Sequence, residues 1–336
     1  MQRVRAVLAV FFACETNPKL RLRWLALAEE EAASSQKNLP WDGANSPGNP
    51  FSCLSLPRDS VKKAFVYLEF YGLKAAPFDI TPNPRFLFHS TKHREAFNHL
   101  LYGIRERKGF VQLTGEVGAG KTTLCRALLE QLDGHYSTAL ILNPVLNADE
   151  LMRAIATEFG LNVRGLDRSD TNAAIGDFLL RQTQAGKDTV LIIDEAQNLT
   201  EDLLEQVRLI SNIETDDRKL LQIVLLGQPE LRDRLNSHKL KQLRQRITVR
   251  YHLKPLTRNE VGQYIHHRLA LAGSPGVPTF TGPAIWRVFR YSQGIPRLVN
   301  ALCDKALLAG FVERSYRINF RMVGRAIREL EGDIHA

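Results

Sequence analysis

The chain has 336 residues, of which 44% are hydrophobic and 24% are charged. This length and composition suit a globular protein with a full α/β domain and a smaller second domain. The four scattered cysteines form no CxxC pair, and no apolar run reaches the roughly 18 to 20 residues that span a bilayer. The net charge of +9 is compatible with nucleic acid, anionic lipid, an acidic partner or simple solubility.

Residues 1–65 carry no motif that points to chemistry. Arg3 and Arg5 precede an apolar stretch with the length of a signal-peptide core, but no clean small-residue cleavage site follows it. Four prolines lie among Gly, Ser and Asn between positions 34 and 60, which is typical of an irregular linker. We predict an irregular and dispensable N-terminal extension over residues 1–65.

Residues 66–255 alternate apolar, strand-like runs with helical patterns. The runs are Gly109–Thr114, Thr138–Asn143, Thr189–Ile193, Leu221–Leu226 and Ile247–His252. Several are almost continuously apolar, as in strands that are buried on both faces of a sheet. Strands that alternate with helices predict right-handed crossovers, and therefore an α/β domain whose parallel five-stranded sheet has flanking helices.

A glycine-rich loop follows the first run and precedes a helical pattern. It fits GxxxxGK[ST] with Gly115, Glu116, Val117, Gly118, Ala119, Gly120, Lys121 and Thr122. The glycines allow backbone N–H groups to turn toward phosphates, and the helix that starts at Thr123 adds positive potential. We expect this loop and Thr123 to bind ATP, with Lys121 reaching the β and γ phosphates and Thr122 binding Mg²⁺. A chance glycine-rich turn is the alternative, which the strand–loop–helix context disfavours.

Two acidic residues, Asp194 and Glu195, end the third run. The carboxyl end of a parallel strand lies at the ligand-binding edge of the sheet. We expect Asp194 to hold Mg²⁺ and Glu195 to orient and polarise the attacking water. The alternative is a solvated helix start.

Gln228 ends the fourth run and precedes Pro229. Its amide is a candidate for contact with the γ phosphate or the attacking water. The alternative is an ordinary turn residue before a proline.

Arg246 comes directly before the fifth run, with Arg244 close to it. We place Arg246 at the sheet edge that carries the nucleotide and expect it to act on the ATP of a neighbouring subunit, which implies a homo-oligomer. Arg244 is the fallback. The alternative is a basic helix end, where cations complement the helix dipole.

Residues 256–336 predict a small all-helical lid domain. Thr257 and Glu260 form a capping-box pattern that opens the first helix. Pro296 opens a later helix, and Arg297 after it is expected to face the nucleotide. A surface arginine is the alternative. The histidines show no metal-ligand spacing, and the adjacent His266 and His267 cannot share a helix face.

These motifs, in this order, resemble those of AAA+ ATPases. The likeness extends from about Tyr67 to Leu330, and it is closer to the branch that includes general secretion pathway protein A and the MSHA pilus biogenesis ATPase. The stretches that carry it are Tyr71–Leu73, Pro77–Phe78, Thr81–Leu87, Gly115–Thr122, Ile193–Gln197, Gly227–Leu231, Leu243–Ile247 and Gly294–Leu298.

The resemblance implies a role for each of these residues. Gly115–Thr122 is the Walker A loop, Asp194 and Glu195 are Walker B, Gln228 is sensor 1, Arg246 is the arginine finger and Arg297 is sensor 2. It also implies that Tyr71–Phe78 pack near the adenine. The sequence that resembles the family begins near Val66. Val66 is therefore a candidate start of translation, encoded by GTG.

The resemblance favours a cytoplasmic enzyme, peripheral to the inner membrane, that hydrolyses ATP to drive or regulate assembly of a pilus or secretion machine. General secretion members resemble the chain only in their ATPase half, so we expect the pilus branch. The alternative is a nucleic-acid-associated AAA+ switch for transposition or replication loading, for which we find no helix-turn-helix. A third reading, binding of ATP without hydrolysis, conflicts with Glu195.

Overall fold

The computed structural model of the protein describes residues 67–332, apart from residues 82, 133, 143, 145–146 and 215–217. All described residues belong to one unit of the chain, Lys63–Ala336. The extension predicted over residues 1–65 lies outside the described residues.

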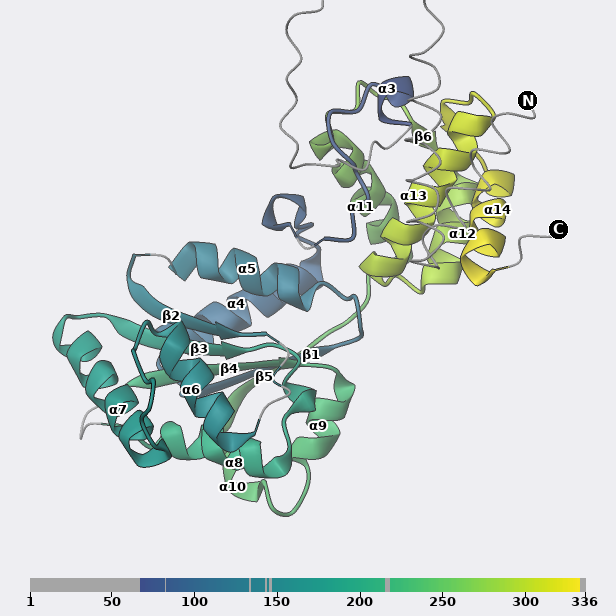
Figure 1. Ribbon diagram of the computed structural model, residues 1–336. Helices are drawn as coiled ribbons and strands as arrows, with labels where there is room; N and C mark the ends of the chain where they lie inside the picture. The colour runs from purple at the N-terminus through teal and green to yellow at the C-terminus, as the bar shows by residue number, and fades with distance from the viewer. Residues whose placement is uncertain are drawn as a thin grey trace, which may run out of the picture. The chain divides into compact units, whose positions relative to one another are not determined.

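A sheet of five parallel strands forms the centre of the α/β part (Figure 1). Its strands are β1 (Phe110–Gly115), β2 (Tyr136–Ile141), β3 (Asp188–Ile193), β4 (Leu221–Gly227) and β5 (Ile247–Leu253). Their order is β2-β3-β4-β1-β5. Each strand overlaps the run predicted for it and is displaced by at most two residues, so the predicted parallel five-stranded sheet is confirmed.

Helices cover both faces of this sheet. On one face lie α4 (Thr91–Arg105) and α5 (Lys121–Leu132). On the other lie α6 (Ala148–Glu158), α7 (Arg168–Gln184), α8 (Glu201–Ile210), α9 (Pro229–Leu235) and α10 (Lys241–Arg246). Figure 1 shows α4 and α5 together on one side of the strands, and α6 and α8 on the opposite side.

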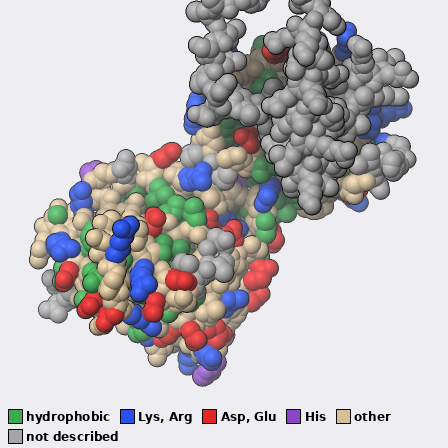
Figure 2. Space-filling model, in the orientation of Figure 1, with side chains coloured by type: hydrophobic (Ala, Val, Ile, Leu, Met, Phe, Trp, Pro, Cys, Tyr) green, Lys and Arg blue, Asp and Glu red, His purple; other side chains and the backbone are tan. Residues whose placement is uncertain are grey.

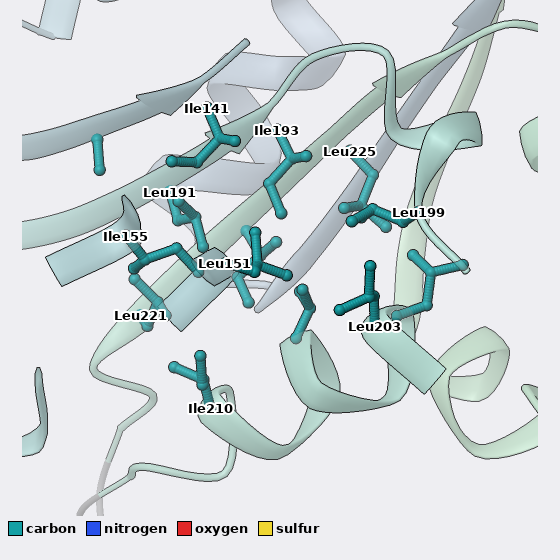
Figure 3. Packing of buried hydrophobic residues seen from close by; sticks show 14 of the residues in the cluster. Ile141, Leu151, Ile155, Leu191, Ile193, Leu199, Leu203, Ile210, Leu221 and Leu225 are labelled. Carbon is teal, nitrogen blue, oxygen red and sulfur yellow. The ribbon is translucent and has the colours of Figure 1, made fainter. Parts of the chain in front are cut away.

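The two apolar cores explain why the strands are apolar at almost every position. Along β3, Val190 and Ile192 pack toward α4 and α5, whereas Leu191 and Ile193 pack into the opposite core with α6 and α8 (Figure 3). All four side chains are 0% exposed. Burying one such side chain contributes roughly 1.5–3 kcal/mol, so both cores stabilise this central strand.

The second part is helical, as predicted, with a short strand pair added. Its helices are α11 (Arg258–Leu271), α12 (Gly282–Ser292), α13 (Pro296–Val312) and α14 (Phe320–Glu331). The predicted capping box between Thr257 and Glu260 is present at the start of α11. A parallel pair, β6 (Thr279–Phe280) and β7 (Arg317–Ile318), departs from the all-helical expectation.

The first described segment packs into the helical part. Tyr67, Tyr71 of the short helix α3 (Leu68–Tyr71), Leu73 and Phe78 are buried in one apolar cluster with α11 to α14. The helical core therefore draws on residues from both sides of the predicted boundary at 255/256. Among the described residues, none of the helices combines the length and apolarity that crossing a bilayer requires.

Charged side chains are mixed on the visible face of the α/β part. In Figure 2, Lys and Arg lie among Asp and Glu across this face, interrupted by small apolar areas. The excess of basic residues is therefore not gathered into a single basic field on the side shown.

Candidate active site

The glycine-rich loop connects the end of β1 to the start of α5. Gly118 and Gly120 have φ angles of 78° and 99°, in the left-handed region that favours glycine. The Lys121 Nζ donates hydrogen bonds to the carbonyl oxygens of Gly115 (2.8 Å) and Glu116 (3.1 Å). Burial lowers the pKa of Lys121, although the carboxylates of Glu195 and Asp194 oppose this effect.

The side chains predicted to hold Mg²⁺ are in direct contact. The Thr122 hydroxyl donates to Asp194 Oδ2 at 2.7 Å, and Asp194 is only 2% exposed. The other carboxylate oxygen, Oδ1, accepts from the Glu195 backbone N–H at 2.9 Å. A hydroxyl and a carboxylate are the hard oxygen ligands that Mg²⁺ prefers, so the residues fit this ion.

Two amide side chains hold the Glu195 carboxylate. Glu195 has a left-handed backbone conformation with φ 52°, which is uncommon outside glycine. Its Oε2 accepts hydrogen bonds from Gln197 Nε2 at 2.6 Å and from Gln228 Nε2 at 3.2 Å. Burial raises the pKa of Glu195, but these hydrogen bonds and the Lys121 charge outweigh it, and the net effect lowers the pKa.

Gln197 was not among the predicted site residues. Its amide links two elements, because its Oε1 accepts from the Gln228 backbone N–H at 3.0 Å while its Nε2 donates to Glu195. In the sequence Gln197 lies two positions after Glu195, close enough to suggest contact. The predicted residue Gln228 is directed at Glu195 in this conformation.

A cavity of about 440 Å³ opens beside the loop. From the predicted set it is lined by Val117, Gly118, Gly120, Lys121, Thr122, Thr123, Glu195 and Arg297. The predicted residues that do not line it are Gly115, Glu116, Ala119, Asp194, Gln228 and Arg246. Asp194 and Gln228 still reach the cavity wall through their hydrogen bonds to Thr122 and Glu195.

The start of α13 contacts the glycine-rich loop. The Arg297 backbone N–H donates to the Gly118 carbonyl oxygen at 3.2 Å. A Cβ atom at Gly118 would lie 2.5 Å from Arg297 Cβ, so only glycine allows this approach. Arg297 therefore lines the cavity, with its side chain exposed, and its contact with a nucleotide stays a prediction.

A buried histidine that sequence reasoning missed supports the loop from α4. His93 Nε2 lies 3.1 Å from the Ala119 carbonyl oxygen, and its Nδ1 lies 2.8 Å from Ser90 Oγ. Since a carbonyl can only accept, Nε2 carries the proton and Nδ1 accepts from the Ser90 hydroxyl. Burial lowers the pKa of His93. Nothing in the local sequence pattern of α4 marks this residue.

Arg268 was also missed, and it organises the far wall of the cavity. It is 7% exposed and donates hydrogen bonds to the carbonyl oxygens of Pro77 and Asp79. Its guanidinium lies over the Phe86 ring, 4.6 Å from the centroid. Arg268 and Phe86 both line the cavity. In the sequence, Arg268 is one basic residue among many on a helix.

The resemblance implies that Tyr71–Phe78 pack near the adenine, and the structure places this segment behind the cavity wall rather than in it. Tyr71 and Phe78 are each 1% exposed and buried in the helical core, and the segment does not line the cavity. The wall starts at the next residues, Asp79, Ile80, Thr81 and Asn83.

The expected position of Arg246 at the nucleotide edge is wrong. Arg246 precedes β5, whereas the glycine-rich loop follows β1, and the two strands are parallel. Ile247 pairs with Phe110 and Leu253 with Gly115, so the two edges are about 20 Å apart at roughly 3.3 Å per residue. The Arg246 guanidinium donates to Ser211 Oγ (3.2 Å) and to Asn212 Oδ1.

Comparisons with known proteins agree with this geometry. A family model described as an AAA domain matches residues 104–235. General secretion pathway protein A of Aeromonas hydrophila is 46% identical over 274 residues, which cover 80% of this chain and 49% of that relative. The chain therefore spans about half the length of the curated relative that it matches.

Solved structures share the fold at low sequence identity. The ORC2 protein of Aeropyrum pernix in its ADP form has a TM-score of 0.58 and 16% identity, over 75% of this chain and 72% of that one. Cdc6p of Pyrobaculum aerophilum has a TM-score of 0.56 and 16% identity, over 78% and 70%. With the loop, the acidic pair and the identity to the secretion protein, the chain belongs to the AAA+ family of general secretion pathway protein A.

Proposed function

We propose that the protein hydrolyses ATP with the help of Mg²⁺. The observation that carries this proposal is the contact between Thr122 and Asp194 beside a carboxylate, Glu195, that two amides keep ionised. All three groups lie at or directly behind a cavity that the glycine-rich loop lines. This combination offers phosphate binding, a cation site and a base for water in one place.

Each residue then has a separate task. The backbone N–H groups of residues 115–120 and the Lys121 ammonium bind the phosphates, for which Lys121 must leave the carbonyls of Gly115 and Glu116. Thr122 and Asp194 would hold Mg²⁺, which neutralises phosphate charge when bound. Glu195 accepts a hydrogen bond from the attacking water, and Gln228 positions Glu195. Arg297 adds a cation beside the loop, next to Gly118.

The pathway is proposed from the named relative. Because the matched relative is a general secretion pathway protein, we propose secretion or pilus assembly proteins as the partners, at the cytoplasmic side of the inner membrane, and a homo-oligomer as the working form. The nucleic-acid alternative rests on the net charge of +9, and on the face that Figure 2 shows, the basic side chains of the α/β part lie among acidic ones.

The test of hydrolysis compares two variants with the wild-type protein. Lys121→Ala should lose binding of labelled ATP, whereas Glu195→Gln should bind ATP and release phosphate more slowly by a factor on the order of 10² to 10⁴. Glu130→Gln, at an exposed position of α5, is a matched control that should behave as wild type. Near-normal phosphate release by Glu195→Gln would refute the catalytic assignment.

The test of pathway uses the same trapped state. Glu195→Gln loaded with ATP should retain assemblies that the wild type releases, and mass spectrometry of the captured material identifies them. Secretion or pilus proteins support the proposal. Capture of nuclease-sensitive nucleic acid instead would favour the switch alternative.

A further inference from the structure

A second cleft lies on the sheet face opposite α5 and shares no lining residue with the cavity at the glycine-rich loop. On β1, Phe110 faces the apolar core with α6 and α8, and strand alternation places Gln112 and Thr114 on the same face. Gln112 pairs with Arg250 of β5, and Thr114 pairs with His252. These four residues, the polar floor, interrupt an otherwise apolar sheet face.

The polar floor contains an amide that lacks a partner. Gln112 is 5% exposed, and within the described residues its side chain forms no hydrogen bond. Thr114 is 3% exposed and its hydroxyl lies 3.0 Å from His252 Nδ1. Gln112 lines the cleft, where solvent or a ligand can supply its hydrogen bonds. An apolar residue at this strand position would avoid the free-energy cost of burying an amide.

Three arginines surround the cleft, which has a volume of about 260 Å³. Arg232 comes from α9, Arg244 from α10 and Arg250 from β5. No carboxylate is among the described residues that line it. Arg232 lies 3.8 Å from Asp233, but both side chains are largely exposed and such pairs are weak.

Two of these arginines are held by neutral groups alone. Arg244 Nη1 donates to Asn236 Oδ1 at 3.4 Å, and Arg250 Nη2 donates to the Arg244 carbonyl oxygen. Neither forms an ion pair within the described part of the chain. A guanidinium has five N–H donors, so most of these donors are left for a ligand.

We propose that this cleft binds a small phosphate-type oxyanion at a site separate from the nucleotide loop. Arginine donors match the oxygen geometry of phosphate, and the Gln112 amide supplies a neutral donor from the floor. The ligand is either free phosphate or the phosphate group of a nucleotide. This proposal does not depend on ATP hydrolysis, because it concerns binding alone.

The experiment measures binding of inorganic phosphate by calorimetry in the full chain carrying Lys121→Ala, which removes the loop lysine. In this background, Arg250→Ala and Arg244→Ala should each weaken phosphate binding by about tenfold or more, as expected for loss of a charge-assisted hydrogen bond. Gln112→Leu should weaken it less. Arg181→Ala, an exposed arginine on α7, is the matched control and should leave binding unchanged.

The outcome separates the two sites and the two sources of phosphate. Competition by ADP in the Lys121→Ala background assigns the cleft to a nucleotide phosphate, and lack of competition assigns it to free phosphate. Phosphate binding that Lys121→Ala abolishes, or that Arg250→Ala and Arg244→Ala leave intact, would overturn the proposal. Circular dichroism of each variant shows that the fold is retained.

Discussion

The charge state of Glu195 depends on two amide side chains. Gln197 and Gln228 both donate to the same carboxylate oxygen, and the net effect lowers its pKa. Amide donors stabilise the ionised form, so their removal must raise the pKa of this base. The two glutamines therefore set the lowest pH at which the proposed base can act.

We predict that Gln197→Leu shifts the acid limb of the pH–rate profile to higher pH. A hydrogen bond to a charged group contributes about 1.5 kcal/mol or more, which corresponds to about one pH unit. Gln228→Leu should shift it in the same direction, and Gln263→Leu at an exposed position of α11 should not. An unchanged acid limb in both site variants would show that Glu195 is not the titrating base.

We predict that His93 makes the folded state less stable in mild acid. Burial lowers its pKa below the ordinary value of 6.5, so the unfolded chain binds the proton more tightly than the folded chain. The contribution of neutral His93 to the free energy of unfolding is therefore fully present above about pH 6.5, and it is lost as the pH falls below that value toward the lowered pKa. The pKa of His267 is also lowered by burial and acts with the same sign.

The measurement is urea unfolding of wild type and His93→Gln at about pH 7.5 and about pH 5.5. The glutamine amide can still donate to Ala119 but does not titrate, so this variant should lose less stability on acidification. His238→Gln, an exposed histidine, is the control and should follow wild type. Equal acid losses in all three proteins would contradict the role given to His93.

At the scale of elements, the glycine-rich loop and the start of α13 are held together by close backbone contact. We predict that Gly118→Ala lowers the free energy of unfolding and weakens ATP binding, because the new Cβ would meet Arg297 Cβ at 2.5 Å. The left-handed φ adds roughly 1–2 kcal/mol of strain.

Gly134→Ala isolates the contact from the backbone strain. Gly134 also has a left-handed conformation, with φ 82°, but nothing lies within 4 Å of a Cβ there. Gly134→Ala should therefore lower the free energy of unfolding by the backbone strain alone and leave ATP binding unchanged. If both variants lose the same stability and keep ATP affinity, the contact between Gly118 and Arg297 has no role in nucleotide binding.

The strands could be predicted from sequence because two cores bury them. Runs such as Val190 to Ile193 have no polar face, and few other structures bury every position of so short a segment. The glycine-rich loop and the acidic pair of Asp194 and Glu195 were equally predictable, because their chemistry depends on residues that are neighbours in the sequence. His93 and Arg268 were not, because their partners, Ala119 and Pro77, are brought near them only by the fold.

The error at Arg246 has a simpler cause. The direction of a parallel strand places Arg246 before β5 at the edge opposite Gly115, and this argument was available from the sequence. Gln112 lies inside an apolar run, and its place beside Arg250 could not be recognised until β5 was placed beside β1.

At the scale of the whole molecule, Arg246 cannot serve the nucleotide of its own chain from the opposite sheet edge. We predict that it acts on the ATP of a neighbouring subunit, where an arginine supplied in trans can contribute about 10³ to 10⁵ in rate. Arg246→Ala should bind ATP normally and hydrolyse it slowly. Hydrolysis by the wild type should rise faster than linearly with protein concentration.

A mixing assay tests this directly. Arg246→Ala and Lys121→Ala are inactive for different reasons, so mixed assemblies should contain some sites with an intact loop and an intact arginine, and should recover part of the activity. Arg244→Ala in place of Arg246→Ala tests the neighbouring arginine. Turnover that does not depend on concentration, without recovery on mixing, would leave Arg246 as a partner of Ser211 and Asn212 alone.

The path of the chain past the cavity has a mechanical consequence. Because the segment from Tyr67 to Phe78 is buried in the helical core, the chain passes between the helical part and the sheet part twice, through residues 79–90 and again through residues 254–257. A domain that is joined to its neighbour by one connection can rotate about any axis. A domain that is joined by two connections rotates most freely about the line through both of them. Nucleotide binding would then rotate the helical part about that line, and α13 would move toward or away from the glycine-rich loop.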